Sequence, residues 1–90
     1  MKLEKISNLL ILLSKKGALE LLNSLIDNPK RYSELKELFS SDKTLSERLK
    51  QFEEYNLIET TSLKSNGRFF VHYQITEKGK EVLAKVKEIK

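Results

Sequence analysis

The dipeptide Asn66-Gly67 constrains the fold of this chain more than any other feature. Both residue types tolerate a positive φ angle, which the tightest two-residue hairpin turns require. In the segment that follows, every second residue is apolar: Phe69, Val71, Tyr73 and Ile75. This period of two is typical of a half-buried strand. We therefore expect an antiparallel hairpin that pairs residues 57–63 with residues 69–75 around a polar tip.

Two short helical segments precede the hairpin, at residues 31–39 and 43–55, with a turn at residues 40–42. Ser33 is expected to cap the first helix, and Arg31-Tyr32 before it is a candidate short strand. For the second helix the cap is Ser41 or Asp42, although a capping box at Thr44 would start it later. The apolar spacing predicts a buried side on each helix, made of Leu35, Leu38, Phe39, Leu45, Leu49 and Phe52.

A helix-turn-helix followed directly by a hairpin is the plan of a winged helix. The predicted fold is therefore α+β and mostly α, with a wing sheet of two or three strands. In that plan the second helix enters the major groove of DNA, and the hairpin tip reaches the backbone or the minor groove. The order of the elements thus predicts a protein that binds double-stranded DNA.

Helical segments flank this motif on both sides. The first carries apolar residues at heptad spacing and is apolar nearly all round, which requires burial on more than one side. Gly17 is expected to interrupt it, and Asn28-Pro29 ends the helix that follows. Thr76 is expected to cap a last helix. We predict one domain over residues 1–90, in which residues 1–14 and 76–90 form a homodimer. In the first segment Leu3, Ile6, Leu10 and Leu13 fall at heptad spacing, and in the last helix Val82, Leu83, Val86 and Ile89 follow one side. The dimer is predicted because Leu9, Ile11 and Leu12 exceed what one intramolecular face can bury, and because Val86 and Ile89 extend beyond the motif.

Composition excludes several classes of function. The net charge of +4 permits binding to polyanions without establishing it. Without any cysteine, and with His72 as the single histidine, the chain offers no thiolate or histidine cluster for a metal, so we expect neither a metal nor a cofactor. A strand histidine with no partner nearby is more often a surface residue than a base, so we expect no enzyme. The longest apolar run, from Leu9 to Leu13, is too short to span a bilayer, and a cytoplasmic protein is expected.

In the segment 43–55 the residues opposite the core define a candidate recognition helix. Four residues are predicted to point straight outward: Lys43, Glu47, Lys50 and Glu54. The acids at helical spacing leave open a solvated, ion-paired face for the two lysines. Arg48 has no acid three or four residues away, so it is either free to contact DNA or covers the edge of the core with its aliphatic stem. The full candidate set is Lys43, Thr44, Ser46, Glu47, Arg48, Lys50 and Gln51.

The hairpin tip and the start of the first helix supply further candidate contacts. Two cations around a glycine in a short loop suit phosphate or the minor groove, although Lys, Ser, Asn and Arg are also ordinary turn residues. The candidate wing residues are Lys64, Ser65, Asn66, Gly67 and Arg68, and the candidate DNA-backbone residues are Arg31, Tyr32 and Ser33.

A second class of function stays open. The charge surplus is small and the candidate recognition helix is rich in acids. A winged helix of this kind also serves as a protein-interaction module within a transcription or replication assembly.

Over residues 14–83 the chain resembles the HxlR-type winged-helix transcription regulators, close to the ArsR and MarR groups. The resemblance implies a homodimeric, DNA-binding regulator in which the first and last helices form the dimer and Ser46, Glu47 and Arg48 lie in the recognition helix. It rests on the order and spacing of Leu21-Leu22 to Pro29, Arg31-Tyr-Ser-Glu-Leu35, Leu45-Ser-Glu-Arg-Leu49, Glu53-Glu54, Leu57-Ile58 and Tyr73-Gln-Ile-Thr-Glu-Lys-Gly79.

This chain departs from the family pattern at two points. Lys16-Gly17 stands where the family often has Lys-Trp, which is expected to loosen the packing there. Family members that sense oxidants or electrophiles use an N-terminal cysteine, and this chain has none.

Overall fold

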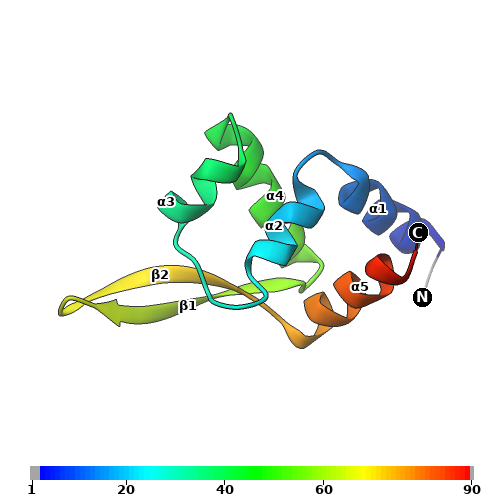
Figure 1. The fold of residues 1–90 in the computed structure, drawn as a ribbon. Coiled ribbons are helices and arrows are strands. Elements are labelled where there is room, and N and C mark those ends of the chain that lie inside the picture. Colours follow the sequence, from blue (N-terminus) through cyan, green and yellow to red (C-terminus); the bar gives the residue numbers. More distant parts are fainter. Residues whose placement is uncertain (1–2, 90) are drawn as a thin grey trace.

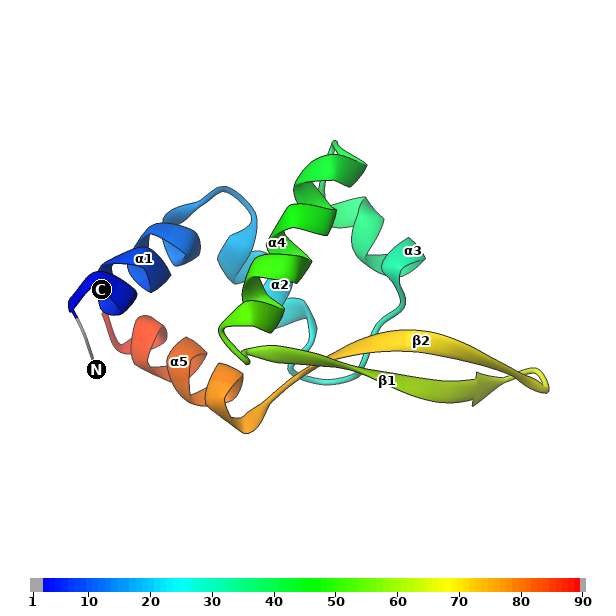
Figure 2. The same cartoon turned by 180° about the vertical axis from the view of Figure 1, so that it is seen from behind.

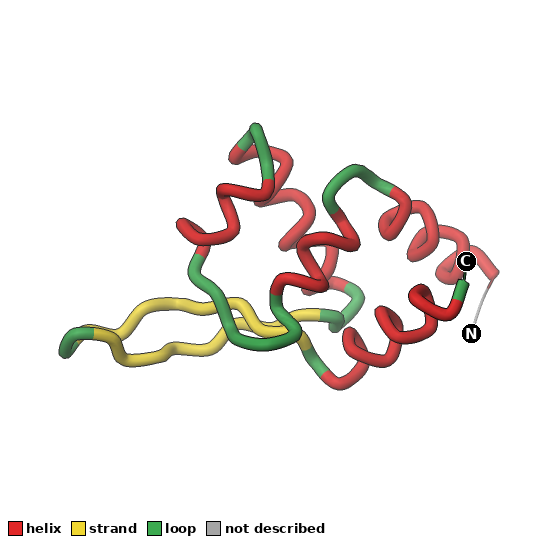
Figure 3. Tube along the Cα trace, viewed as in Figure 1, coloured by secondary structure: helices red, strands yellow, loops and turns green. Residues whose placement is uncertain are grey.

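A computed structural model describes residues 3–89 and shows helices gathered at one end and a hairpin projecting from the other (Figure 1). Helices α1 and α5 occupy the end opposite the hairpin tip, and the molecule measures 46 × 27 × 24 Å. The order along the chain is helix α1 (Leu3–Ser14), α2 (Ala18–Ser24), α3 (Tyr32–Leu35), a 3-10 turn (Lys36–Leu38), α4 (Asp42–Glu54), strands β1 (Ile58–Ser65) and β2 (Arg68–Ile75), and α5 (Glu77–Glu88). This is the predicted winged-helix fold (Figure 3).

One apolar core holds the helices and the base of the hairpin together. Phe52 of α4 is its largest fully buried side chain, and Leu45 and Leu49 are buried on the same side of that helix, as predicted. Leu38 departs from the prediction, because the helix tightens into a 3-10 turn after Leu35 and carries this side chain outward. The buried apolar residues are Leu12, Leu13, Ala18, Leu21, Leu22, Leu25, Leu35, Leu45, Leu49, Phe52, Leu57, Ile58, Ile75 and Leu83.

The turn between α1 and α2 depends on Gly17, whose φ of 80° lies in the left-handed region. A Cβ atom at this position would lie 2.6 Å from Cε1 of Phe39, closer than van der Waals contact allows. The phenyl ring therefore packs directly on the glycine. The looser packing expected from the loss of tryptophan here stays a prediction.

The hairpin has the expected turn. Asn66 and Gly67 both have positive φ angles, 51° and 79°, and the strands pair from Ile58 with Ile75 to Ser65 with Arg68. Both strands extend one or two residues further toward the tip than predicted. The sheet of the described residues has two strands, and Lys30 adds an isolated antiparallel bridge to Tyr73. The third strand expected at Arg31-Tyr32 is thus reduced to this bridge.

Helix α3 begins two residues earlier than predicted. Its N-cap is Arg31, and the Glu34 carboxylate accepts a hydrogen bond of 3.0 Å from the Arg31 backbone N–H. Ser33 lies inside the helix and is exposed, so the prediction that it is the cap is wrong. The early start follows the Lys30–Tyr73 bridge, after which only Arg31 remains extended before the helix begins.

The base of the hairpin is locked against α5. The Thr76 hydroxyl accepts from the Gly79 backbone N–H at 3.0 Å, as the predicted cap requires, and donates to the Asn56 carbonyl at 2.7 Å. A Cβ atom at Gly79 would collide with the Leu57 carbonyl oxygen. The glycine therefore allows α5 to approach the start of β1 closely.

No helix within residues 3–89 has the length and apolarity that crossing a membrane requires.

Candidate nucleic-acid interface

Helix α4 presents one uncovered face. Ser41 caps it, because the Ser41 hydroxyl accepts from the Thr44 backbone N–H at 3.3 Å. The outward positions Lys43, Glu47 and Lys50 are exposed, as the helical spacing predicts. In Figure 2, which shows the molecule from behind, α4 lies in front and continues through a short turn into β1. The uncovered face and the hairpin are thus connected directly, through residues 55–57 alone.

The two flanks of α4 are engaged within the molecule. On the flank next to α3, the Tyr32 hydroxyl donates to the Asp42 carbonyl at 3.0 Å, so the Ser46 hydroxyl, 2.9 Å away, must donate to Tyr32. Lys36 also pairs with Asp42 at 3.5 Å. These contacts set how α3 and α4 lie relative to each other, and they involve two residues predicted to contact DNA.

On the other flank Arg48 has a hydrogen-bond partner on its own helix. Its Nη1 atom donates to Oε1 of Gln51 at 3.2 Å, and its Nε atom is buried without a hydrogen-bond partner in the structure. The expectation that Arg48 is free of partners on its own helix is wrong, because the side-chain amide of Gln51 accepts its hydrogen bond although no acid lies at helical spacing. The side chain is half-buried, which fits a stem that covers the core edge.

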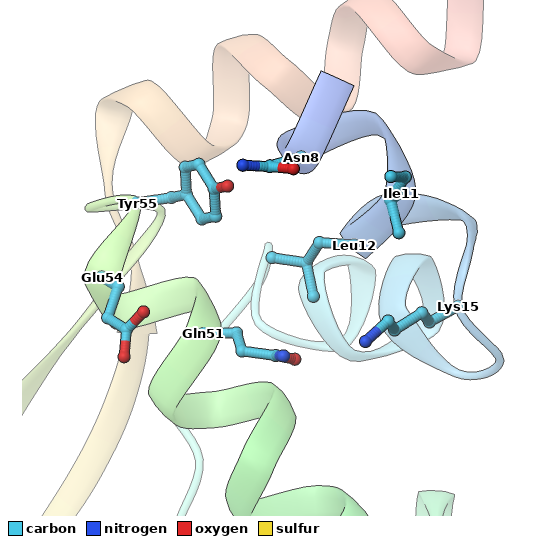
Figure 4. A pocket seen from close by; sticks show the side chains of 7 residues that line it. All are labelled: Asn8, Ile11, Leu12, Lys15, Gln51, Glu54 and Tyr55. Carbon is cyan, nitrogen blue, oxygen red and sulfur yellow. The ribbon is translucent and has the colours of Figure 1, made fainter. Parts of the chain in front are cut away.

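A pocket of about 200 Å³ lies between this flank of α4 and helix α1 (Figure 4). Gln51, Glu54 and Tyr55 line it from α4 and the turn that follows. From the other side come Leu12, the half-buried Lys15 at the end of α1, and two further α1 residues, Asn8 and Ile11. The pocket therefore lies between two separate surfaces, the uncovered face of α4 and helix α1.

The lysines of α4 are not ion-paired. The two ion pairs found among residues 3–89 are Lys36 with Asp42 and Lys80 with Glu77. The acids at helical spacing from Lys43 and Lys50 therefore leave both ammonium groups in solvent.

The hairpin tip is exposed throughout residues 62–69, which include the candidate residues Lys64, Ser65, Asn66, Gly67 and Arg68. Along β2 burial falls steadily toward the tip, from buried Ile75 to half-buried Tyr73 and then to exposed Val71 and Phe69. The expectation that all four are half-buried is wrong for the last two. Eight residues of strand span about 27 Å, which carries the tip beyond the helices that cover the base.

The start of α3 contacts the edge of the hairpin. The Arg31 guanidinium lies 4.5 Å from the centre of the Phe70 ring, a cation–π contact that leaves the cation half-buried. Beside it, Nδ1 of His72 donates to the Phe70 carbonyl at 2.8 Å, which indicates the tautomer with the proton on Nδ1. The candidate backbone residues Arg31 and Tyr32 therefore already have intramolecular partners, whereas Ser33 is exposed.

Tyr73 links the hairpin to both helices of the motif. Burial raises the pKa of its phenol, and the nearby Glu53 carboxylate and Tyr32 add to the rise. All three effects disfavour the ionised phenolate. This tyrosine is therefore a neutral packing residue beneath α3 and α4.

A second surface lies at the opposite end. Leu3, Ile6, Leu10 and Ile11 of α1 are exposed, Leu3 to 80%, and Ile89 after α5 is exposed to 76%. Leu12 and Leu13 point into the core instead. Helix α1 is thus buried along one side and leaves an uncovered apolar stripe along the other.

The fold and the uncovered helix beside a hairpin define a winged helix-turn-helix protein of the transcription-regulator class. An HxlR-like helix-turn-helix family model matches residues 12–90, and the chain belongs to this family. Because this family and the similar solved structures are transcriptional regulators, membership supports a DNA-binding regulator.

Solved structures agree. The reduced form of the transcriptional regulator YodB from B. subtilis is 33% identical, with a TM-score of 0.81 over 99% of this chain and 88% of that one. Diamide-treated YodB from B. subtilis is also 33% identical, with a TM-score of 0.82 over 99% of this chain and 89% of that one. A PadR family transcription regulator from Clostridium difficile R20291 shares only the fold, at 22% identity and a TM-score of 0.73 over 82% of this chain and 85% of that one. No curated protein matches by sequence.

Proposed function

We propose that this protein binds double-stranded DNA in a sequence-specific manner, as a homodimer, and regulates transcription. The observation that carries the proposal is the uncovered face of α4, joined without a flexible linker to an exposed hairpin that bears two cations. An α-helix fits the major groove of B-DNA, and a hairpin beside it reaches the flanking backbone.

Within α4 the residues have different roles. Lys43, Glu47 and Lys50 are unpaired and face outward, so they are the proposed readers of base edges. Thr44 and Gln51 border this face, and Ser46 reaches it while its hydroxyl is held by Tyr32. Arg48 would have to give up its bond to Gln51 to form a bidentate pair with guanine, so we assign it to a phosphate.

The backbone contacts come from the hairpin tip and from α3. Lys64 and Arg68 are exposed cations on paired strands, and the turn between them offers the polar groups of Ser65, Asn66 and Gly67. At the start of α3, Ser33 is exposed, and Arg31 and Tyr32 beside it are proposed as weaker contacts because both have other partners.

The homodimer is proposed to form through α1 and α5. Leu3, Leu10, Ile11 and Ile89 are exposed aliphatic side chains at one end of the molecule. Burial of such a side chain contributes about 1.5–3 kcal/mol, so a few of them are enough to hold two copies together. The dimer would present two copies of α4 and of the hairpin to DNA.

A salt titration tests the DNA part of the proposal. If a dimer neutralises roughly 6–10 phosphates, its affinity for duplex DNA should fall about 10³–10⁵-fold between 50 and 200 mM salt. The site is first selected from a random pool with purified protein, and binding to it is compared with binding to random duplex. A flat salt response, or equal affinity for both duplexes, would contradict the proposal.

Sedimentation tests the dimer separately. The full chain should sediment as a dimer at micromolar concentration, and deletion of residues 1–13 should give a monomer or an unstable chain. A stable full-length monomer would contradict this part alone, since a monomer can still bind half a site.

One observation favours a second candidate function. Helix α4 carries four acids, Asp42, Glu47, Glu53 and Glu54, against three bases, which gives it a net charge of −1. An acidic helix is repelled by phosphate and suits a protein partner. The salt titration separates this protein-interaction module from the DNA-binding regulator.

The similar regulator YodB has been solved in reduced, diamide-treated and quinone-bound forms. The 90 residues of this chain contain no cysteine. We therefore propose DNA binding that is not switched by oxidation of a thiol in these residues.

A further inference from the structure

The hairpin beyond its base is free of acids. Residues 60–76 include Lys64 and Arg68 but no Asp or Glu, in a chain that has 13 acids in 90 residues. The last acid before this stretch, Glu59, lies at the base of β1, where it accepts a hydrogen bond from Gln74. The projecting part of the hairpin is therefore a purely basic surface, unlike α4.

Phe69 stands at the centre of this surface. It directly follows Arg68 and is the cross-strand partner of Lys64, and its side chain is 70% exposed. The neighbouring ring of Phe70 is different, because it lies on the other face and is covered by Arg31. Lys64 shares the face of the Phe69 ring, whereas Arg68 precedes the ring on the other face, so the two cations flank it from the two faces of the hairpin. A phenyl ring exposed in this way at the far end of a projecting hairpin buries little in the folded chain.

The charge around the ring indicates its occupant. A protein partner would need a wider apolar surface, but of the hairpin's other exposed apolar residues only Val71 shares this face, and Leu63 lies on the opposite one. Double-stranded DNA offers phosphates for both cations and, between the two backbones, base steps that an apolar side chain can enter. Proteins that bind the minor groove use this combination, with apolar side chains inserted at a base step.

We propose that Phe69 enters the minor groove as an apolar wedge, while Lys64 and Arg68 contact the phosphates on either side. This inference rests on the proposed function and deepens it. Insertion unstacks a base step, and pyrimidine–purine steps such as TA are the easiest to unstack. The wing then contributes sequence preference, through the step that the ring enters and not through hydrogen bonds to bases.

The experiment uses the full chain and the duplex selected from the random pool. A single 2-aminopurine is moved along the site, because its fluorescence rises when its stacking is lost. The variants are Phe69→Ala, Phe69→Leu and, as a matched control on the opposite face of the hairpin, Leu63→Ala. Both positions are exposed, so the thermal melting curves of the three variants should match that of the wild type.

We expect the wild-type protein to raise the fluorescence at one step beyond the α4 contacts. Phe69→Ala should abolish this rise and bind about 10-fold more weakly. Phe69→Leu should stay within about threefold, because an aliphatic wedge also inserts. Leu63→Ala should behave as the wild type. Replacing a TA step at this position with a GC step should weaken the wild type but not Phe69→Ala.

Three results would overturn the wedge. The first is a Phe69→Ala variant that binds as tightly as the wild type with the fluorescence rise intact, and the second is a Leu63→Ala variant that loses as much affinity as Phe69→Ala. The third is a change in the sedimentation of the DNA-free protein caused by Phe69→Ala, since that would assign the ring to a contact between copies. If the wild type binds no duplex at all, the proposed function itself fails, which is a different outcome.

Discussion

Helix α4 and the β1–β2 hairpin are the two parts of the molecule that face the proposed DNA, and they are built on opposite principles. One side of α4 lies in the core. On one flank Ser46 bonds to Tyr32, and on the other flank Arg48 bonds to Gln51. The outer hairpin has no such ties and is exposed on both faces near its tip. The helix carries a net charge of −1, whereas residues 60–76 carry two cations and no acid.

This difference suits α4 and the hairpin to different parts of DNA binding. A rigid helix with mixed charges gains little from phosphate attraction, but it can present donors and acceptors to base edges in a defined position. A basic hairpin supplies attraction that does not depend on sequence. We therefore expect selectivity to depend on α4 and overall affinity to depend on the hairpin.

The largest expected effect comes from removing the two cations of the hairpin. Lys64→Ala with Arg68→Ala removes four charges from a dimer, which should lower the salt slope by about 3–4 and the affinity about 100-fold or more on every sequence. The matched helix pair, Lys43→Ala with Lys50→Ala, changes the net charge equally. It should weaken the selected site more than random duplex. Identical losses for the two pairs on both duplexes would remove the distinction between the regions.

Two glycines test how the hairpin is held. Gly79→Ala forces a Cβ atom against the Leu57 carbonyl and within 2.6 Å of the Ile75 side chain, so unfolding should become about 1–3 kcal/mol easier. Gly67→Ala at the tip meets no neighbouring atom and costs only its positive φ, about 1 kcal/mol. Thermal melts of both variants measure the difference. A larger loss for Gly67→Ala would mean that the tip, and not the base, holds the hairpin.

Arg48→Ala tests the flank of α4. It removes the bond to Gln51 and the stem over the core edge, which should lower the free energy of unfolding by about 1 kcal/mol. As a phosphate contact, it should weaken selected and random duplex by the same factor. A loss confined to the selected site, with relaxed preference at one base pair, would show instead that Arg48 reads a base.

The smallest effect concerns pH and the packing beneath both regions. Since the pKa of Tyr73 is raised in the folded protein, its contribution to stability is present below the ordinary tyrosine pKa of about 10 and is lost as the pH rises through the folded value. Tyr73→Phe should therefore lose less stability than the wild type between pH 9 and 11. Denaturant unfolding at a series of pH values measures this. Parallel curves for the two proteins across that range would contradict the prediction.

Local sequence patterns predicted the order of the elements well. Asn66-Gly67 specifies its turn through φ angles, and Leu45, Leu49 and Phe52 specify the buried side of α4 through helical spacing, so neither depends on distant contacts. The expectations that failed depend on tertiary geometry. The exposure of Phe69 follows from how far the hairpin extends beyond the helices. An apolar period of two along the strand gives no information about that distance.

The predicted site shows the same limit. Helical spacing correctly placed Lys43, Glu47 and Lys50 in solvent. It could not reveal that the hydroxyl of Ser46 bonds to the hydroxyl of Tyr32, which lies 14 residues earlier in the chain. The partner of Arg48 lay within reach of sequence reasoning, because Gln51 is three residues away on the same helix. A search for amides as well as acids would have found it.

The contact between Gly17 and Phe39 has a consequence for how this sequence can change. The ring occupies the space that any side chain at position 17 would need, and the left-handed backbone there resists replacement even without the ring. A large residue can therefore enter position 17 only if position 39 becomes smaller and the turn is rebuilt. The two sites, 22 residues apart, are expected to vary together among descendants of this chain and to give strongly non-additive double mutants.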